Sequence, residues 1–235
     1  MKVSNYQLSC LCNDAYSDNS TSMIIDETGI KYNWIVDSKF CSRRIGFACN
    51  LYFLESNNLL SPKVAVLAFR GTEVSDLDDL LNDAAIAVGS LPPQALFAIQ
   101  VAKEAKAYYS GLILTGHSLG GALAIIASAH TDTEAITFNA PGTESSCFNS
   151  SALSVFEDRP IKSFLNIVKN CSEGAKVNNI KIGGDMVSIF LLKQVGTTTT
   201  LMEAKCDGQF NYLCKHEIGT ITDTIKNRPA RSGSW

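Results

Sequence analysis

The stretch "LILTGHSLGGALAIIASAH", residues 112–130, decides the fold that we predict for this chain. An apolar, strand-like run (111–115) leads into the hexapeptide "GHSLGG" (116–121), and an apolar, helix-like run covers 119–130. A polar turn between two buried segments needs an explanation. A sharp strand-to-helix turn of the form Gly-x-Ser-x-Gly exposes a serine hydroxyl, which makes Ser118 a candidate nucleophile. The alternative is a glycine-rich loop that only connects a strand to a helix.

The rest of the sequence alternates between strand-like and helix-like patterns. This alternation predicts an α/β fold, with a mostly parallel central sheet and helices on both faces. In such folds the chemistry lies at the carboxyl ends of the strands, and Ser118 falls at one of those ends. The expected strands are 45–56, 63–71, 111–115 and 135–139, and the expected helices are a first segment capped by Ser4, then 75–88, 93–109 and 119–130.

Composition limits the classes of protein to which the chain can belong. With 235 residues, 46% of them apolar, it has enough hydrophobic residues for one large domain, which we place at 1–226, with a flexible tail at 227–235. A net charge of −3 and the absence of a Lys or Arg run argue against nucleic acid as a partner. No stretch has the apolar length of a signal peptide or a transmembrane helix. We therefore expect a soluble protein, cytoplasmic or exported without a cleavable signal.

The chain has a high count of cysteines. We expect most of them to be reduced and buried, because a chain of this length does not need disulfides to fold. A structural metal site is the alternative, since Cys206, Cys214 and His216 form C-x₇-C-x-H and Cys10 or Cys12 would add a ligand. That spacing is unusual for zinc, so we expect neither a metal nor another cofactor. The eight cysteines are Cys10, Cys12, Cys41, Cys49, Cys147, Cys171, Cys206 and Cys214.

A serine hydroxyl is a weak nucleophile at neutral pH and needs a general base. The chain has three histidines, so elimination is informative. His117 directly precedes Ser118, and in an elbow its ring would point away from the hydroxyl. His130 lies roughly 16 Å along the following helix at 1.5 Å per residue. His216, in "LCKHEIG", is the base left by elimination, and the alternative is a packing or surface histidine.

The carboxylate that orients the base is expected between Ser118 and His216 in chain order. Asp185 is the preferred candidate, because it follows a strand-like run and a glycine pair in "IKIGGDMVSIF" (180–190). A carboxylate in a loop at the carboxyl end of a strand has this sequence context. Asp158 is the alternative, although Arg159 beside it suggests an ordinary surface pair.

The developing oxyanion needs backbone or hydroxyl donors. The N–H of Leu119, at the start of the helix, is one candidate, and Thr72 at the end of "VAVLAFRGT" (64–72) is the second. A simple strand-ending turn explains the "RGT" sequence equally well. The acidic, leucine-rich segment 73–91 is a hypothetical lid, with a fixed helix packed on the sheet as the equal alternative.

Four segments together resemble the class 3 lipases, the fungal-type triacylglycerol lipases and their bacterial relatives. They are "VLAFRGTE" (66–73), "LTGHSLGGALA" (114–124), "ITFNAPG" (136–142) and "GGDMVS" (183–188), and the resemblance covers roughly residues 5–220. It implies an α/β-hydrolase that cleaves acylglycerol or phospholipid esters without a metal. It also implies Ser118 as nucleophile, Asp185 as acid and His216 as base, with Thr72 and Leu119 as the oxyanion hole.

These observations predict a serine ester hydrolase that works through an acyl-enzyme. The expected partner is a lipid or small ester substrate, with transient contact to a membrane or lipid interface. A thioesterase or an acyltransferase would use the same triad and is the first alternative. A non-catalytic binding protein that keeps the hydrolase scaffold is the alternative from a different class.

Overall fold

The computed structural model describes residues 2–17, 22–26, 28–44, 47–54, 64–71, 94–151, 161–174, 176–190, 193–202, 206 and 212–227. The helix expected at 75–88 and the tail beyond residue 227 lie outside these ranges. The strands are β1 (Ser22–Ile25), β2 (Lys31–Val36), β3 (Ser42–Arg44), β4 (Phe47–Leu54), β5 (Val64–Phe69), β6 (Gly111–His117), β7 (Glu134–Phe138), β8 (Val177–Ile182) and β9 (Thr197–Leu201). The helices are α1 (Asn5–Asp14), α3 (Gln94–Tyr108), α4 (Leu119–Thr131), α5 (Glu144–Ser150), α7 (Ile161–Glu173), α8 (Met186–Phe190), α9 (Tyr212–His216) and α10 (Ile218–Lys226), with a 3-10 turn η1 (Ser38–Phe40).

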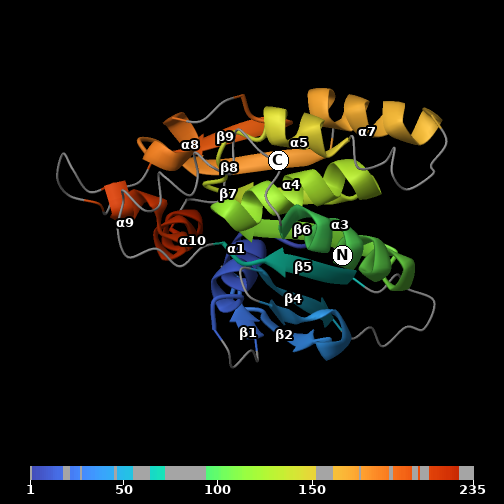
Figure 1. Cartoon of the computed structure of the whole chain (residues 1–235). Coiled ribbons are helices and arrows are strands. Elements are labelled where there is room, and N and C mark those ends of the chain that lie inside the picture. Colours follow the sequence, from blue (N-terminus) through green and yellow to red (C-terminus); the bar gives the residue numbers. More distant parts are fainter. Residues whose placement is uncertain are drawn as a thin grey trace.

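The strands form one mixed sheet in the order β1-β2-β4-β5-β6-β7-β8-β9, with β3 paired to β4 (Figure 1). From β5 to β9 every pair is parallel, as expected, whereas β1 to β5 pair antiparallel. The predicted α/β class is confirmed, and the antiparallel pairing of β1 with β2 has a local cause. Between β1 and β2, Asp26 Oδ1 accepts the N–H groups of Thr28 and Ile30, both at 2.9 Å. A turn this tight joins neighbouring strands only as an antiparallel hairpin, whereas parallel strands need crossover helices.

Alternating side chains of the central strand β5 divide the interior into two cores. Ala65, Leu67 and Phe69 lie in the core that α3, α4 and α7 cover. Val66 and Ala68 lie in the other core, which α1 and α10 cover. Because successive side chains of a strand point to opposite faces, β5 is buried on both sides and reads as a continuous apolar run. Helices on both faces of the sheet were predicted, and this is confirmed.

Helix α4 lies at the centre of one helical layer, beside α3, α5 and α7 (Figure 1). From Gly120 to Thr131 every residue of this helix is buried. A helix that is apolar all round has no solvent face and needs neighbours on every side. Contacts with β6, β7, α3 and α7 supply them, so the helix that follows Ser118 is held rigidly.

Helix α1 begins with a capping box. The side chain of Ser4 accepts the N–H of Gln7, and the Gln7 side chain accepts the N–H of Ser4. This reciprocal pair satisfies donors that the first turn of a helix leaves without acceptors. Leu8 and Leu11 are fully buried against the sheet, as their helical spacing predicts.

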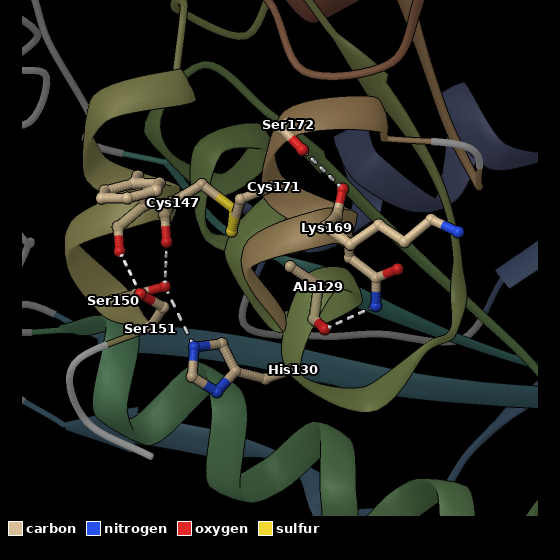
Figure 2. The surroundings of a disulfide bond; sticks show 10 residues. Ala129, His130, Cys147, Ser150, Ser151, Lys169, Cys171 and Ser172 are labelled. Carbon is tan, nitrogen blue, oxygen red and sulfur yellow. Dashed lines mark hydrogen bonds between the residues drawn. A yellow bond between two sulfur atoms is a disulfide. The ribbon is translucent and has the colours of Figure 1, made fainter. Parts of the chain in front are cut away.

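Two disulfides correct the expectation that most cysteines are reduced. Cys147 of α5 is bonded to Cys171 of α7, with their Cα atoms 5.5 Å apart (Figure 2), and Cys206 is bonded to Cys214 of α9. Beside the first bridge, the Ser150 hydroxyl donates to the Cys147 carbonyl and accepts from His130 Nε2 at 3.0 Å. His130 is therefore a structural histidine. The positions of the cysteines along the chain carry no signal for a pairing between two helices.

Among the described residues, no helix is both long and apolar enough to cross a membrane.

Candidate active site

The serine of the hexapeptide lies at a sharp turn between β6 and α4. Ser118 is the N-cap of α4 and has φ 55° and ψ −129°, outside the regions that non-glycine residues favour. A backbone held in such a region costs on the order of 1–3 kcal/mol and persists only where the surroundings enforce it. Hydrogen bonds enforce it here, because Ser118 N–H donates to Phe138 O (3.1 Å) and Ser118 O accepts from Gly121 N–H (2.9 Å). The predicted elbow geometry is confirmed.

Two glycines make room for this turn. A Cβ on Gly116 would lie 2.2 Å from the carbonyl oxygen of Gly120. A Cβ on Gly120 would lie 2.2 Å from the carbonyl oxygen of Phe69, at the end of β5. Real Cβ atoms do not approach backbone so closely, so both positions require glycine, as the sequence predicts. The close approach also fixes the elbow against the loop that leaves β5.

Asp185 and His216, 31 residues apart in the chain, are in direct contact. Asp185 Oδ1 lies 2.8 Å from His216 Nδ1, and both side chains are buried. The second carboxylate oxygen, Oδ2, accepts the N–H of Ser188 at 2.9 Å and so caps α8. Gly184, with φ 86°, makes the turn that carries Asp185 from the end of β8 into this position. The alternative acid, Asp158, lies outside the described residues.

The contact with Asp185 leaves one ring nitrogen of His216 available. A carboxylate only accepts, so the neutral imidazole carries its hydrogen on Nδ1 and has a lone pair on Nε2. Nε2 is buried and has no hydrogen-bond partner among the described residues. A buried polar atom without a partner costs free energy and therefore calls for a functional reason. An acceptor for the hydroxyl proton of a nucleophile is one such reason.

The backbone of the candidate base is held by two side chains. His216 O accepts from His117 Nε2 at 2.6 Å and from Asn139 Nδ2 at 3.2 Å. Asn139 Nδ2 also donates to Lys215 O at 2.8 Å, while Asn139 Oδ1 accepts the N–H of Ile182. The last carbonyl oxygens of a helix have no N–H donor within that helix. The side-chain donors therefore satisfy the carbonyl oxygens at the end of α9. Asn139 has φ 44°, a left-handed conformation that asparagine tolerates.

Asn139 was not identified as a functional candidate from the sequence, although it lies in the quoted segment "ITFNAPG". The role of His117 was also missed, since only its proximity to Ser118 was considered. Burial and, to a smaller extent, the neighbouring His216 ring lower the pKa of His117 to about 3, although its hydrogen bond to the His216 carbonyl and the Asp185 carboxylate act in the opposite direction. The ring centroids of His117 and His216 are 4.8 Å apart. His117 is therefore neutral and able to support His216 as a hydrogen-bond donor.

Of the two candidate oxyanion donors, only Leu119 lies within the described residues. Leu119 begins α4, where the first N–H groups of a helix have no acceptor within it and the helix dipole favours negative charge. Thr72 and the hypothetical lid at 73–91 lie outside the described residues. Gly71, directly before Thr72, is packed against the elbow, since a Cβ there would lie 2.7 Å from His117 O.

The alternative metal site is not assembled. Cys206 and Cys214 are bonded to each other, so neither thiolate is available to zinc in this state. Across the described ranges no three His, Cys, Asp or Glu side chains are grouped as metal ligands.

The strand–serine–helix unit, with an acid after a later strand and a histidine near the carboxyl end of the chain, is the arrangement of an α/β-hydrolase. The predicted fold is therefore confirmed. The chemical roles of Ser118, Asp185 and His216 stay predictions at this point.

Comparisons with known proteins find a matching family model and a similar phospholipase. A family model of the phospholipase-like group, the Tle-like phospholipase domain, matches residues 28–230. An extracellular phospholipase A1 of Serratia liquefaciens is 35% identical over 156 residues, which cover 62% of this chain and 44% of that protein. The chain thus spans less than half the length of this curated relative.

Two solved esterases are similar at low identity. An esterase of Pyrococcus furiosus has a TM-score of 0.38 and 11% identity, over 83% of this chain and 91% of that chain. A thermostable esterase of Pseudomonas putida has a TM-score of 0.37 and 12% identity, over 87% of this chain and 82% of that chain.

The burial of neutral His117 predicts a loss of stability in acid. Because its pKa falls from 6.5 to about 3 on folding, the unfolded chain takes up a proton below about pH 6.5 that the folded chain does not. The free energy of unfolding should therefore fall as the pH drops from about 6.5 towards 3, by at most about 1.4 kcal/mol per pH unit from this group. Urea unfolding of wild type and His117→Gln between pH 7 and pH 4 measures it. The free energy of unfolding of the variant should change less per pH unit than that of the wild type. Equal changes would contradict a buried, neutral His117.

Proposed function

The chain belongs to the phospholipase-like family with the Tle-like phospholipase domain, and from this membership we propose that it hydrolyses carboxylic esters of lipids through Ser118, His216 and Asp185. The observation that supports the triad most is the buried contact of 2.8 Å between Asp185 Oδ1 and His216 Nδ1. This contact orients the ring and leaves Nε2 as the only proton acceptor of the imidazole. The strained elbow supports Ser118 as the nucleophile.

The proposed reaction is acyl transfer in two steps. His216 Nε2 takes the proton of the Ser118 hydroxyl while Ser118 Oγ attacks the ester carbonyl carbon, and the carbonyl electron pair moves onto oxygen. The N–H of Leu119 and the donors of Thr72 stabilise that oxyanion. As the C–O bond breaks, the imidazolium gives its proton to the leaving alcohol. Water then hydrolyses the acyl-enzyme by the same route, and Asp185 remains ionised throughout.

We propose an aggregated phospholipid as the substrate class. The family and the Serratia relative, a phospholipase A1 by name, support this choice. Leu213, one turn before His216, and Met202 are apolar side chains exposed to solvent, at 39% and 78%. Met202 lies beside Gly183, two residues before Asp185, and Leu213 shares the short helix α9 with His216. Both side chains offer apolar contact to a lipid interface. Lys215 extends over Gly184 and supplies one cation for a phosphate group.

The narrower resemblance to class 3 lipases is part of this proposal. The comparisons support a lipase or phospholipase family without distinguishing class 3 from other branches. A thioesterase or an acyltransferase with the same triad is the alternative. A substrate panel separates these activities.

We further propose that the protein works outside the reducing cytoplasm. Disulfides persist in oxidising compartments, and two are formed here. The name of the Serratia relative, an extracellular enzyme, is consistent with this location.

Replacing the nucleophile gives the direct test of function. We expect the wild-type protein to release fatty acid from phosphatidylcholine vesicles and Ser118→Ala to lose at least about 10⁴-fold in turnover, because the acyl-enzyme cannot form. Ser172→Ala is the matched control, since Ser172 is exposed on α7 and donates only to its own helix. Triacylglycerol emulsion, a short p-nitrophenyl ester and an acyl-coenzyme A complete the panel.

The outcomes of this panel are distinct. Wild-type turnover by Ser118→Ala would overturn the proposed nucleophile. Faster turnover of acyl-coenzyme A than of every oxygen ester would favour the thioesterase. Absence of turnover on all substrates by the oxidised wild type would favour a binding protein.

The second disulfide should matter for turnover, because Cys214 lies two residues before His216 in the five-residue helix α9. A helix this short is not stable by itself, so its anchor to Cys206 helps to hold the base. We expect the double variant Cys206→Ser/Cys214→Ser to lose on the order of 10- to 100-fold in kcat. The matched control Cys147→Ser/Cys171→Ser should lose about 3 kcal/mol of stability and keep its kcat. Equal kcat values for both double variants at a temperature where both are folded would contradict this role.

A further inference from the structure

Tyr16, two residues beyond the end of α1, has a hydroxyl group that joins two parts of the candidate site. Its oxygen lies 3.1 Å from the N of Gly71 and 3.1 Å from Nδ1 of His117. Gly71 belongs to the loop that leads into Thr72, and His117 is the residue directly before Ser118. The Tyr16 and His117 rings meet edge to face, with centroids 6.1 Å apart. An amino-terminal segment that precedes Gly71 by more than 50 residues therefore enters the site.

The directions of these hydrogen bonds follow from their donors. A backbone N–H only donates, so Gly71 donates to the Tyr16 oxygen. The hydrogen of the Tyr16 hydroxyl is then directed to His117 Nδ1, which accepts it. A neutral imidazole that accepts at Nδ1 carries its hydrogen on Nε2, and this atom faces His216 O at 2.6 Å. The opposite tautomer would set a lone pair against the carbonyl oxygen.

We propose that Tyr16 is a positioning residue, whose hydroxyl fixes the tautomer of His117 and thereby holds the backbone of His216 in register with Gly71, which follows β5. The proposal rests on the function proposed above. One oxygen atom links Gly71 to His117 in the elbow, and through His117 to the carbonyl of His216. Rigid support of this kind matters because displacing a general base by about 1 Å greatly slows the reaction.

Neighbouring groups hold the Tyr16 ring and the His216 backbone in place. Burial keeps the Tyr16 phenol protonated by raising its pKa. Arg70 lies with its guanidinium carbon 5.6 Å from the centre of the Tyr16 ring and holds the ring from one side. Asn139, the residue directly after β7, supports the same carbonyl of His216, so loss of the Tyr16 hydroxyl should shift the base without releasing it.

Tyr16→Phe tests the proposal by removing one oxygen atom. We expect kcat for a short p-nitrophenyl ester to fall on the order of 10- to 100-fold, with KM unchanged, because the altered geometry affects the transition state. Affinity for a boronic acid, which forms a tetrahedral adduct with the serine, should fall by a similar factor. Tyr52→Phe is the matched control, since it also loses a buried hydroxyl, one that contacts Asn50 and Asp14 and neither Gly71 nor His117.

A spectroscopic readout reports the tautomer itself. Nitrogen-15 correlation spectra of the histidine rings should show His117 as the Nε2–H tautomer in the wild type and in Tyr52→Phe. In Tyr16→Phe a population of the Nδ1–H tautomer should appear. A purely structural tyrosine would lower the melting temperature and leave both kcat and this tautomer unchanged.

The results separate the inference from the proposed function. If Ser118→Ala is inactive while Tyr16→Phe matches Tyr52→Phe in kcat and tautomer, the inference is wrong and the proposed function stands. If Ser118→Ala turns over the ester like the wild type, the proposed function fails and the inference fails with it.

Discussion

The structure depends on one steric constraint at the end of β6, where the chain turns sharply into α4 and packs directly against neighbouring backbone. Gly116 and Gly120 approach backbone so closely that neither position has room for a Cβ, and Ser118 is held at φ 55° between them. The strain is offset by the burial of α4, which is apolar on all sides and enclosed by β6, β7, α3 and α7. The strained turn is thus supported by a helix that is buried on all sides. An ordinary connecting loop would not need this support.

Segments far apart in the sequence converge on this turn because the carboxyl ends of β5 to β8 meet at one edge of the sheet. The turn after β8 carries Asp185, and the residue after β7, Asn139, holds the end of α9 and with it His216. The loop after β5 brings Gly71 against the elbow. Hydrogen bonds through Tyr16 and His117 connect these parts. The contact between Asp185 and His216, the proposed acid–base pair, is therefore held in place by the fold itself.

The sequence allowed the strand–turn–helix unit to be predicted because its signals are local: apolar period, glycines and a single serine. The contact of Asp185 with His216 followed from chain order and from the small number of histidines. The antiparallel strands β1 to β3 are short and partly exposed, so they carry little periodic signal. The two disulfides and the bonds of Tyr16 and Asn139 join distant segments, and no spacing rule reports such pairings. Thr72 lies outside the described residues, so its role rests on the sequence and the proposal.

The central claim is that His216 and Asp185 activate Ser118, and covalent labelling tests it most directly. After reaction with a fluorophosphonate, peptide mass spectrometry of the wild-type protein should find the label on Ser118. Asp185→Asn should react on the order of 10⁴-fold more slowly, because the imidazole loses its required tautomer. A label on another residue, or an unlabelled protein that still hydrolyses phospholipid, would contradict the account.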